Sequence, residues 1–381
     1  MSDKVQKYNI PVLKKNQPDE QYKFRMAPAP SGTYPFHLKL EDVQSTENLD
    51  KKMVFHMLGD TGSINHADFL RQVAGEMFRQ YNEAESTEDK PSFLYHLGDI
   101  VYNHGEATQY ARQFFEPFEN YPSSIFAIAG NHDSDVNPDS NEPYESLDAF
   151  KAVFCDRKPE VVPFSGNSRR KSMIQPNVFW TLETPLANII GLHSNVPKYG
   201  IITPEQRSWL VDELITARQE IPRKALILCL HHAPFSADIN HGSSLPMIEF
   251  LQGVFEETGV RPDIVCSGHV HNYQRFTKKY ADGRHEVPFI VAGAGGYDGL
   301  HEIVHTNDDN FYTENPLLEG VQLECFCDNQ HGFLKIAIEK NDNGLTLTGS
   351  YYAISHNIDV HSNSKGEQIS SLWDRFEIKI C

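Results

Sequence analysis

Five short motifs of Gly, Asp, Asn and His lie along the chain, each directly after an apolar run. They are Gly59-Asp60-Thr61-Gly62, Gly98-Asp99-Ile100-Val101-Tyr102, Gly130-Asn131-His132-Asp133, His231-His232-Ala233-Pro234 and Gly268-His269-Val270-His271. Carboxylate and amide oxygens and imidazole nitrogens are common metal ligands. One such motif alone is usually a turn or a loop. Their number and order together indicate a metal centre.

The apolar runs that precede the motifs have the length of β-strands. They cover residues 53–58, 93–97, 125–129, 225–230 and 264–267. In open α/β sheets the carboxyl ends of the strands line one crevice. The sequence therefore predicts that all five motifs deliver their side chains to one place.

The order and wording of the motifs resemble the calcineurin-like metallophosphoesterases, and within them the purple acid phosphatases, from about Val54 to Leu300. Many relatives place a His two residues after the first Asp, where this chain has Gly62. Tyr102, three residues beyond Asp99, stands where purple acid phosphatases use a tyrosinate. Tyrosine loses its proton only near pH ~10, so this ligand needs a strongly Lewis-acidic metal, and ferric iron fits best. A buried Tyr102 that bonds only through its hydroxyl is the alternative.

The resemblance implies a ligand set for a dinuclear centre. The expected ligands are Asp60, Tyr102 and His271 for the first metal, Asn131, His232 and His269 for the second, and Asp99 as the bridge between them. Such donors suit Fe(III) beside Zn(II), Fe(II) or Mn(II). The choice of His232 over His231 follows only from the family pattern, which places the ligand two residues before Pro234.

The same resemblance assigns two histidines to catalysis and, together with Asn131, to substrate binding. His132 would contact the substrate phosphate. His241, nine residues after His232, would protonate the leaving alkoxide. An imidazole with a pKa near ~6.5 suits both roles. A solvated loop histidine is the alternative for His241.

The implied reaction is hydrolysis of phosphate monoesters by a hydroxide that two metals hold, as in an acid phosphatase. Hydrolysis of phosphodiesters or nucleotide pyrophosphates at the same centre is the second hypothesis, because loops decide between these substrates. A catalytically silent metal-binding interaction protein is the third hypothesis, and the presence of both His132 and His241 argues against it.

Composition narrows the class of partner. The chain has 381 residues, of which 39% are hydrophobic and 23% charged, as in an ordinary globular protein. A formal net charge of -18 argues against nucleic-acid and anionic-membrane partners, which Lys and Arg bind. We therefore expect a small phosphorylated substrate. The compact basic cluster Ser168-Arg169-Arg170-Lys171 is interpreted as a solvated loop.

The first residues, from Met1 to Tyr8, have no apolar h-region. We therefore expect a cytoplasmic protein, or a secreted or periplasmic one if the N-terminus has been trimmed. No apolar run reaches the roughly 18 residues of a membrane span. The six cysteines give no clear disulfide or zinc framework.

The remaining patterns predict how the chain is organised. Residues 1–50 form an expected N-terminal extension that packs on a catalytic domain at 51–381, with residues 134–175 as a loop that forms a substrate wall. Helices are expected at 65–84, 106–118, 203–219 and 244–257, and further strands at 36–40, 333–339, 345–353 and 372–380. The expected fold is an α/β, four-layer α/β/β/α sandwich of two mixed sheets flanked by helices.

Overall fold

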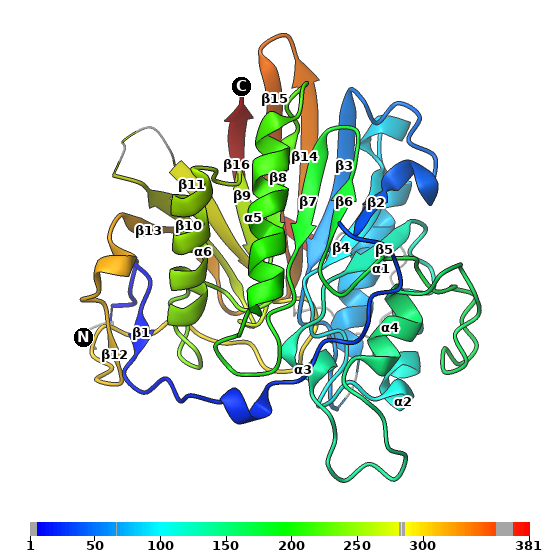
Figure 1. The fold of residues 1–381 in the computed structure, drawn as a ribbon, viewed down its shortest axis with the longest axis horizontal. Helices are drawn as coiled ribbons and strands as arrows, with labels where there is room; N and C mark the ends of the chain where they lie inside the picture. Colours follow the sequence, from blue (N-terminus) through cyan, green and yellow to red (C-terminus); the bar gives the residue numbers. More distant parts are fainter. Residues whose placement is uncertain (1–5, 66, 282, 284–285, 356–368) are drawn as a thin grey trace.

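Two β-sheets lie face to face in the computed structural model, which describes residues 6–65, 67–281, 283, 286–355 and 369–381 (Figure 1). The larger sheet has the strand order β13 (Val321–Cys327), β10 (Tyr273–Lys279), β11 (Glu286–Ala292), β9 (Ile264–Ser267), β8 (Ala225–Cys229), β7 (Ala187–Gly191), β6 (Trp180–Glu183) and β2 (His37–Lys39). The smaller sheet has the order β16 (Ser370–Ile380), β15 (Gly344–Ile354), β14 (Gly332–Asn341), β3 (Lys52–Leu58), β4 (Pro91–His96) and β5 (Ser124–Ala127). Both sheets mix parallel and antiparallel pairs.

Aromatic rings fill the space between the sheets. Tyr95 of β4 stacks on Trp180 of β6 with 6.1 Å between ring centroids. Tyr273 of β10 stacks on Tyr351 of β15 at 3.9 Å. All four side chains are fully buried, and rings of this size dominate the apolar area that a core removes from water. These buried rings therefore pack the two sheets against each other.

Helices cover the outer faces of the sandwich. The helices α5 (Pro204–Gln219) and α6 (Leu245–Thr258) lie over the larger sheet (Figure 1). Both begin with a side-chain cap followed by proline, a common helix start. On the smaller sheet, Gln80 of α1 (Asp68–Asn82) contacts His56 of β3 at 3.4 Å. The predicted α/β sandwich of two mixed sheets with flanking helices is confirmed.

The predicted helix at 106–118 is interrupted. An α-helical turn, α2 (Ala107–Tyr110), passes into a π-helical turn at Ala111–Phe115. Gln113 in this turn bonds to the backbone of Tyr102 in both directions, at 2.9 and 2.7 Å, and accepts a hydrogen bond from the Ser63 N–H at 2.8 Å. Single π-turns within helices often occur at functional sites. Through Gln113, this turn links the backbone at Ser63, next to the first motif, to the backbone of Tyr102 in the second motif.

The other elements are short. They comprise β1 (Leu13–Lys14), β12 (Phe311–Tyr312), α3 (Asn131–Ser134), α4 (Asp148–Phe154) and 3-10 turns at Gln21–Lys23, Leu40–Asp42, Thr87–Asp89 and Pro316–Leu318. The strand β1 pairs with β12, and the blue N-terminal segment runs along the lower edge of the molecule (Figure 1). The basic cluster has a structural contact, because Arg170 Nε donates to the carbonyl of Phe118 at 2.7 Å.

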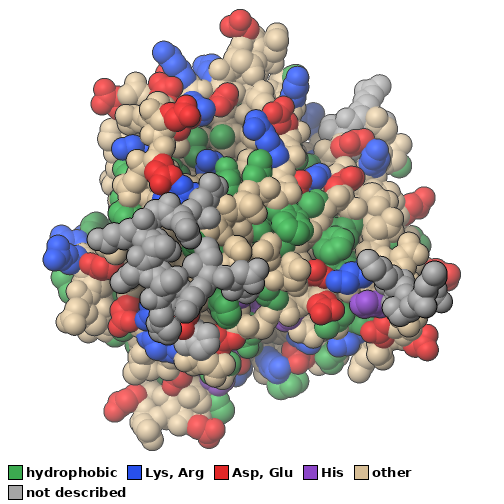
Figure 2. Space-filling model, turned by 180° about the vertical axis from the view of Figure 1, so that it is seen from behind, with side chains coloured by type: hydrophobic (Ala, Val, Ile, Leu, Met, Phe, Trp, Pro, Cys, Tyr) green, Lys and Arg blue, Asp and Glu red, His purple; other side chains and the backbone are tan. Residues whose placement is uncertain are grey.

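The surface carries charges of both signs. Figure 2 shows acidic and basic side chains interspersed over the described part of one face. The negative net charge is therefore not gathered into one acidic patch on that face. Among the described residues, no helix combines the length and the apolar character that a bilayer crossing requires.

Candidate metal centre

The five motifs converge at the strand ends, as the sequence predicts. Three of the converging residues, Asp60, Asp99 and His269, have left-handed backbones with φ values of 57, 55 and 67°. This conformation is uncommon outside glycine and costs an L-residue roughly 1–2 kcal/mol. Backbone strain of this kind clusters at functional sites, where the surrounding fold maintains it. The fold thus maintains three residues with strained backbones around the place where the motifs meet.

The hydroxyl of Tyr102 joins the side chains that the sequence assigns to the first metal. It lies 2.7 Å from Asp99 Oδ2, 3.2 Å from Asp60 Oδ1 and 3.1 Å from His271 Nε2. Asp60 and Asp99 are almost completely buried, and Tyr102 and His271 are buried as well. The backbone N–H of His269 also donates to both oxygens of Asp60. Four predicted ligands therefore share one buried point.

Gly62 and Tyr102 occupy complementary positions. A Cβ atom added at Gly62 would lie 2.7 Å from Tyr102 Cδ2 and 2.6 Å from Gln113 Oε1. Real Cβ atoms essentially never make such contacts, so no side chain fits at position 62 while Tyr102 stays in place. The structure therefore explains the absence of histidine at this position: the tyrosine ring uses the space.

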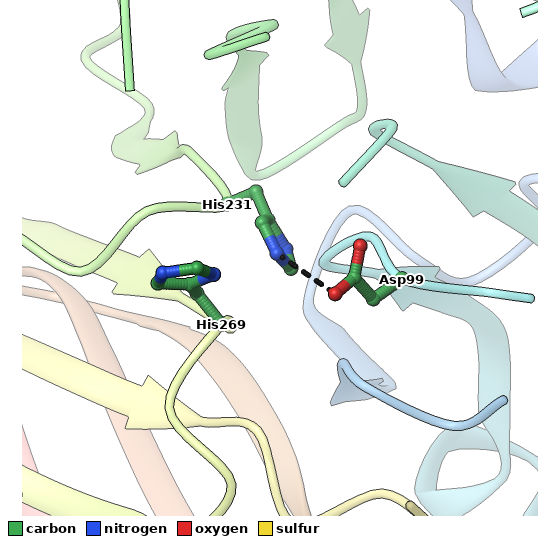
Figure 3. A group of neighbouring side chains, drawn as sticks. All are labelled: Asp99, His231 and His269. Carbon is green, nitrogen blue, oxygen red and sulfur yellow. Dashed lines mark ion pairs between the residues drawn. The ribbon is translucent and has the colours of Figure 1, made fainter. Parts of the chain in front are cut away.

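A second group of side chains surrounds Asn131. Its Oδ1 atom lies 2.9 Å from His269 Nδ1 and 3.1 Å from His231 Nε2. His231 Nε2 also lies 3.3 Å from Asp99 Oδ2, the ion pair that is dashed in Figure 3. Asp99, His231 and His269 present ligand atoms that all lie within 4.8 Å of one another. Asp99 thus contacts both groups, as expected of a bridge.

His231, rather than His232, faces this group, which differs from the sequence-based choice. His232 instead directs Nδ1 to the Ser194 hydroxyl at 2.7 Å, and its Nε2 is buried without a hydrogen-bond partner. Adjacent residues at the end of a strand point in different directions. A shift of one residue along the chain therefore decides which of the two imidazoles lies in the cluster. His231 Nδ1 donates to the carbonyl of Leu97 at 2.8 Å, which leaves Nε2 for a ligand.

The donor set fits metal cations. Asp60 and Asp99 are buried carboxylates, and among the described residues the ion pairs they form are with histidines only. Burial raises the pKa of Asp60, so its ionised form needs a nearby cation. Burial also lowers the pKa of His269 and of His271, which keeps these imidazoles neutral and able to bind a metal. Buried charges are normally paired or bound to metals.

We expect His231→Ala and His232→Ala to differ in metal content. Loss of His231 should remove one of two ions per chain, because its Nε2 contacts both Asp99 and Asn131. Loss of His232 should leave both ions bound. Elemental analysis of the two proteins, purified without chelator, measures this. Two ions in His231→Ala together with one ion in His232→Ala would restore the sequence-based assignment.

The two predicted catalytic histidines lie beside the ligands. The His132 ring is tilted against Tyr102 at 4.2 Å, and its backbone N–H donates to Asp99 Oδ1 at 2.9 Å. The His241 ring lies 4.2 Å from that of His269, with Nδ1 3.4 Å from Asp238 Oδ2. Burial lowers the pKa of His241, and Asp238 opposes this effect. Both histidines line the cleft that also exposes Asn131.

A second cluster was not predicted. Asp238, His241 and His301 also place ligand atoms within 4.8 Å of one another, so the described residues include two candidate metal-binding groups. The oxygens of Asp238, however, already accept hydrogen bonds from the backbone N–H groups of Asn240, His241 and Gly242. This carboxylate therefore fixes the loop that carries His241.

The cleft over the centre has a volume of about 570 Å³. The lining residues that sequence analysis missed are Lys14, Lys198, Asn240, Tyr297, Gly299, Leu300 and His301. The only signal for His301 and Tyr297 is their place after the apolar run of β11, as for the motifs. Residues 134–175, interpreted from sequence as a substrate wall, contribute no side chain to this lining.

Comparisons with known proteins agree with this geometry. The family of calcineurin-like phosphoesterases matches residues 53–273, more than half of the chain. Two uncharacterized proteins of Mycobacterium tuberculosis are 28% identical over 200 residues; the match covers 49% of this chain and 35% of each relative, so the chain spans about a third of their length.

One solved structure shows the same fold, and a second has a lower TM-score. The structure titled as GAP50, the anchor in the inner membrane complex of Plasmodium, has a TM-score of 0.52 at 14% identity, covering 87% of this chain and 90% of its own. A structure of PhoD has a TM-score of 0.47 at 13% identity, covering 92% and 71%. With the family match over more than half of its length and the ligand side chains gathered at the strand ends, the chain belongs to the calcineurin-like metallophosphoesterases.

Proposed function

We propose that the protein hydrolyses phosphate monoesters at a dinuclear centre of the purple acid phosphatase type. The observation that carries this proposal is the Tyr102 hydroxyl, which lies within 3.2 Å of Asp60, Asp99 and His271. Gly62 is the second half of the same observation, because its missing side chain leaves room for the tyrosine ring. A centre with a histidine at position 62 needs no tyrosine ligand.

The ligand groups could hold two ions, with Asp99 contributing to both groups. The proposed ligands are Asp60, Tyr102, His271 and Asp99 for the first ion, and Asp99, Asn131, His231 and His269 for the second. Bound there, two cations supply Lewis acidity, a nucleophilic hydroxide near neutral pH and neutralisation of phosphoryl charge. The phenolic oxygen of Tyr102 makes ferric iron the proposed first metal, beside Zn(II), Fe(II) or Mn(II).

The chain's own side chains hold the substrate and move the proton. His132 presents its ring at the cleft, with Nδ1 2.6 Å from the carbonyl of Asn103, so Nε2 is left for a phosphoryl oxygen. His241 directs Nδ1 toward Asp238, which leaves Nε2 to carry the proton that the leaving alkoxide receives. Both histidines thus have one nitrogen held by the protein and one available to substrate.

Turnover of 4-nitrophenyl phosphate and of its bis ester tests this proposal. The metal-loaded protein should hydrolyse the monoester faster, and a chelator should remove the activity. Faster turnover of the bis ester favours the phosphodiesterase hypothesis. No turnover of either substrate at full metal loading favours a non-catalytic binding protein, against which the paired placement of His132 and His241 argues.

Tyr102→Phe tests the subtype through colour. A tyrosinate bound to ferric iron should give the wild-type protein a visible charge-transfer band, and the phenylalanine variant should lose it. Activity should survive in part, because Asp60, Asp99 and His271 still surround the position. Absorption spectra of both proteins, loaded with iron under oxidising conditions, measure this.

Tyr297→Phe is the matched control for the colour, because its ring lies 4.5 Å from that of Tyr102 while its hydroxyl belongs to no ligand group. This variant should keep the band. A colourless wild type, or a band that persists in Tyr102→Phe, would leave Tyr102 as a hydroxyl that only bonds to the ligands.

A further inference from the structure

Two lysines, Lys14 and Lys198, line the cleft over the metal centre, together with the ligand and catalytic side chains. Among the residues that the structure describes, the lining includes no other lysine and no arginine. The whole chain has an excess of acidic residues, with a net charge of -18, so cations at this cleft are not a consequence of average composition. Their position calls for a local explanation.

The backbone fixes both lysines from separate segments. Lys14 lies in β1, whose neighbour Val12 bonds to Ser236 and Ser243 on either side of the His241 loop, at 2.9 and 2.7 Å. The Lys14 ammonium donates to the carbonyl of Asn240 at 3.3 Å. The first lysine therefore lies next to His241.

Lys198 follows β7 in the loop that precedes α5. Its backbone N–H donates to Glu20 Oε2 at 2.9 Å, and its neighbour Tyr199 donates its hydroxyl to the carbonyl of His241 at 3.3 Å. Lys198 lines the same cleft as Lys14. Burial lowers the pKa of Lys198, Lys14 acts in the same direction, and Asp238 and Glu20 oppose this effect. Lys14 and Lys198 thus flank the same histidine.

Neither ammonium group is neutralised by an ion pair in the described part of the chain. The two carboxylates that act electrostatically on Lys198 also have other partners: Glu20 pairs with Lys23 at 2.7 Å, and Asp238 bonds to its own loop and to His301 at 3.1 Å. Two partly buried cations close together are unfavourable unless an anion compensates them. The arrangement has the charge that a bound dianion would balance.

We propose that Lys14 and Lys198 bind a second phosphoryl group, carried by the alcohol part of the substrate. This inference rests on the proposed function, because it places the alcohol beside the acid His241. In the reaction, the bond between phosphorus and the leaving oxygen breaks, and the oxygen of water takes its place. A proton from His241 goes to the leaving oxygen, and the proton that the water releases to solvent balances the one that His241 takes up again. The second phosphoryl group stays unchanged. The preferred substrates are therefore bisphosphorylated alcohols.

Two aryl phosphates with a single scissile ester test this preference. One is 4-(phosphonomethyl)phenyl phosphate, whose carbon–phosphorus bond resists hydrolysis, and the other is the uncharged analogue 4-(hydroxymethyl)phenyl phosphate. The wild-type ratio of kcat/KM should favour the phosphonate. It should fall about 10-fold in Lys14→Gln or Lys198→Gln and about 100-fold in the double variant, as for the loss of charge-assisted hydrogen bonds.

The exposed neighbour Lys15 supplies the matched control, because it does not line the cleft. Lys15→Gln should keep the wild-type ratio. A double variant whose ratio stays within about twofold of the wild type, the size of a rim-charge effect, overturns the inference.

Binding of the product 4-hydroxybenzylphosphonate, measured by titration calorimetry, separates this inference from the proposed function. Its dissociation constant for the protein as purified should rise about 10-fold in the double variant. Absence of hydrolysis with lysine-dependent binding sinks the proposed function but supports the anion site. Hydrolysis without lysine-dependent selectivity or binding sinks the anion site alone.

Soluble bisphosphates and bisphosphorylated lipid headgroups both carry this chemistry. Phosphate release from a hexose bisphosphate in solution and from vesicles that contain a phosphatidylinositol bisphosphate distinguishes the two sources. On the source that is hydrolysed, the double variant should be about 10-fold slower or more. Equal rates of wild type and double variant on both sources contradict the inference.

Discussion

Asp99→Ala is expected to lose both metal ions and to reduce kcat/KM for a phosphate monoester by about 10³-fold or more. A metal stabilises transition-state charge by several kcal/mol, and ~1.4 kcal/mol corresponds to a factor of ten. Asp99 is the side chain that contacts both ligand groups, through Tyr102 at 2.7 Å and His231 at 3.3 Å. Elemental analysis and steady-state kinetics on the same protein sample measure both effects.

Asp263→Ala is the control for loss of a buried carboxylate. Asp263 lies before β9, its side chain is 10% exposed, and it pairs with Arg223 at 2.6 Å. This variant should keep its metals even where its stability falls. Two ions retained in Asp99→Ala would show that Asp99 is not the bridge.

His241→Ala is expected to keep both ions and to slow hydrolysis of an alkyl phosphate by ~10² to 10⁴-fold, the usual contribution of a general acid. The imidazole contacts the ring of His269 and Asp238 but belongs to neither proposed ligand group. An alkoxide needs a proton to leave, whereas 4-nitrophenolate does not. The rate loss should therefore be much smaller for 4-nitrophenyl phosphate.

His305→Ala provides the histidine control, because His305 lies outside the cleft lining. Its rates on both substrates should match those of the wild type. If His241→Ala slows the alkyl and the nitrophenyl substrate equally, His241 acts by another route than proton donation. If it loses metal, His241 is a ligand.

The sequence predicts most of the centre because the relevant information is local. Asp60, Asp99, Asn131, His269 and His271 each lie within four residues of the end of a strand, so the end of the strand largely determines where the side chain lies. The parallel order of these strands then brings the side chains together. A motif placed after an apolar run therefore predicts both where its side chain lies and that it meets the side chains of the other motifs.

Other features of the site depend on tertiary contacts that no local pattern contains. The direction of His231 or His232 is decided by bonds to Leu97 and Ser194, which lie 134 and 38 residues away in the sequence. His301 reaches the centre because a loop after β11 packs its ring on His271 at 4.3 Å. In the fold, the strands β6, β7, β10, β11 and β13 were not predicted from the sequence, although Thr184-Pro185 marks the turn between β6 and β7.

The N-terminal segment lies outside the region that matches the family, yet it contacts the candidate site. Residues 53–273 carry the family signature, yet the hydrogen bonds from Val12, Lys14 and Gln17 brace the loop of His241. A protein shortened to the matched region would retain every proposed ligand but lose this brace and one of the two lysines. The length of chain needed to build the ligand set is therefore shorter than the length needed to hold the loop of His241 in place.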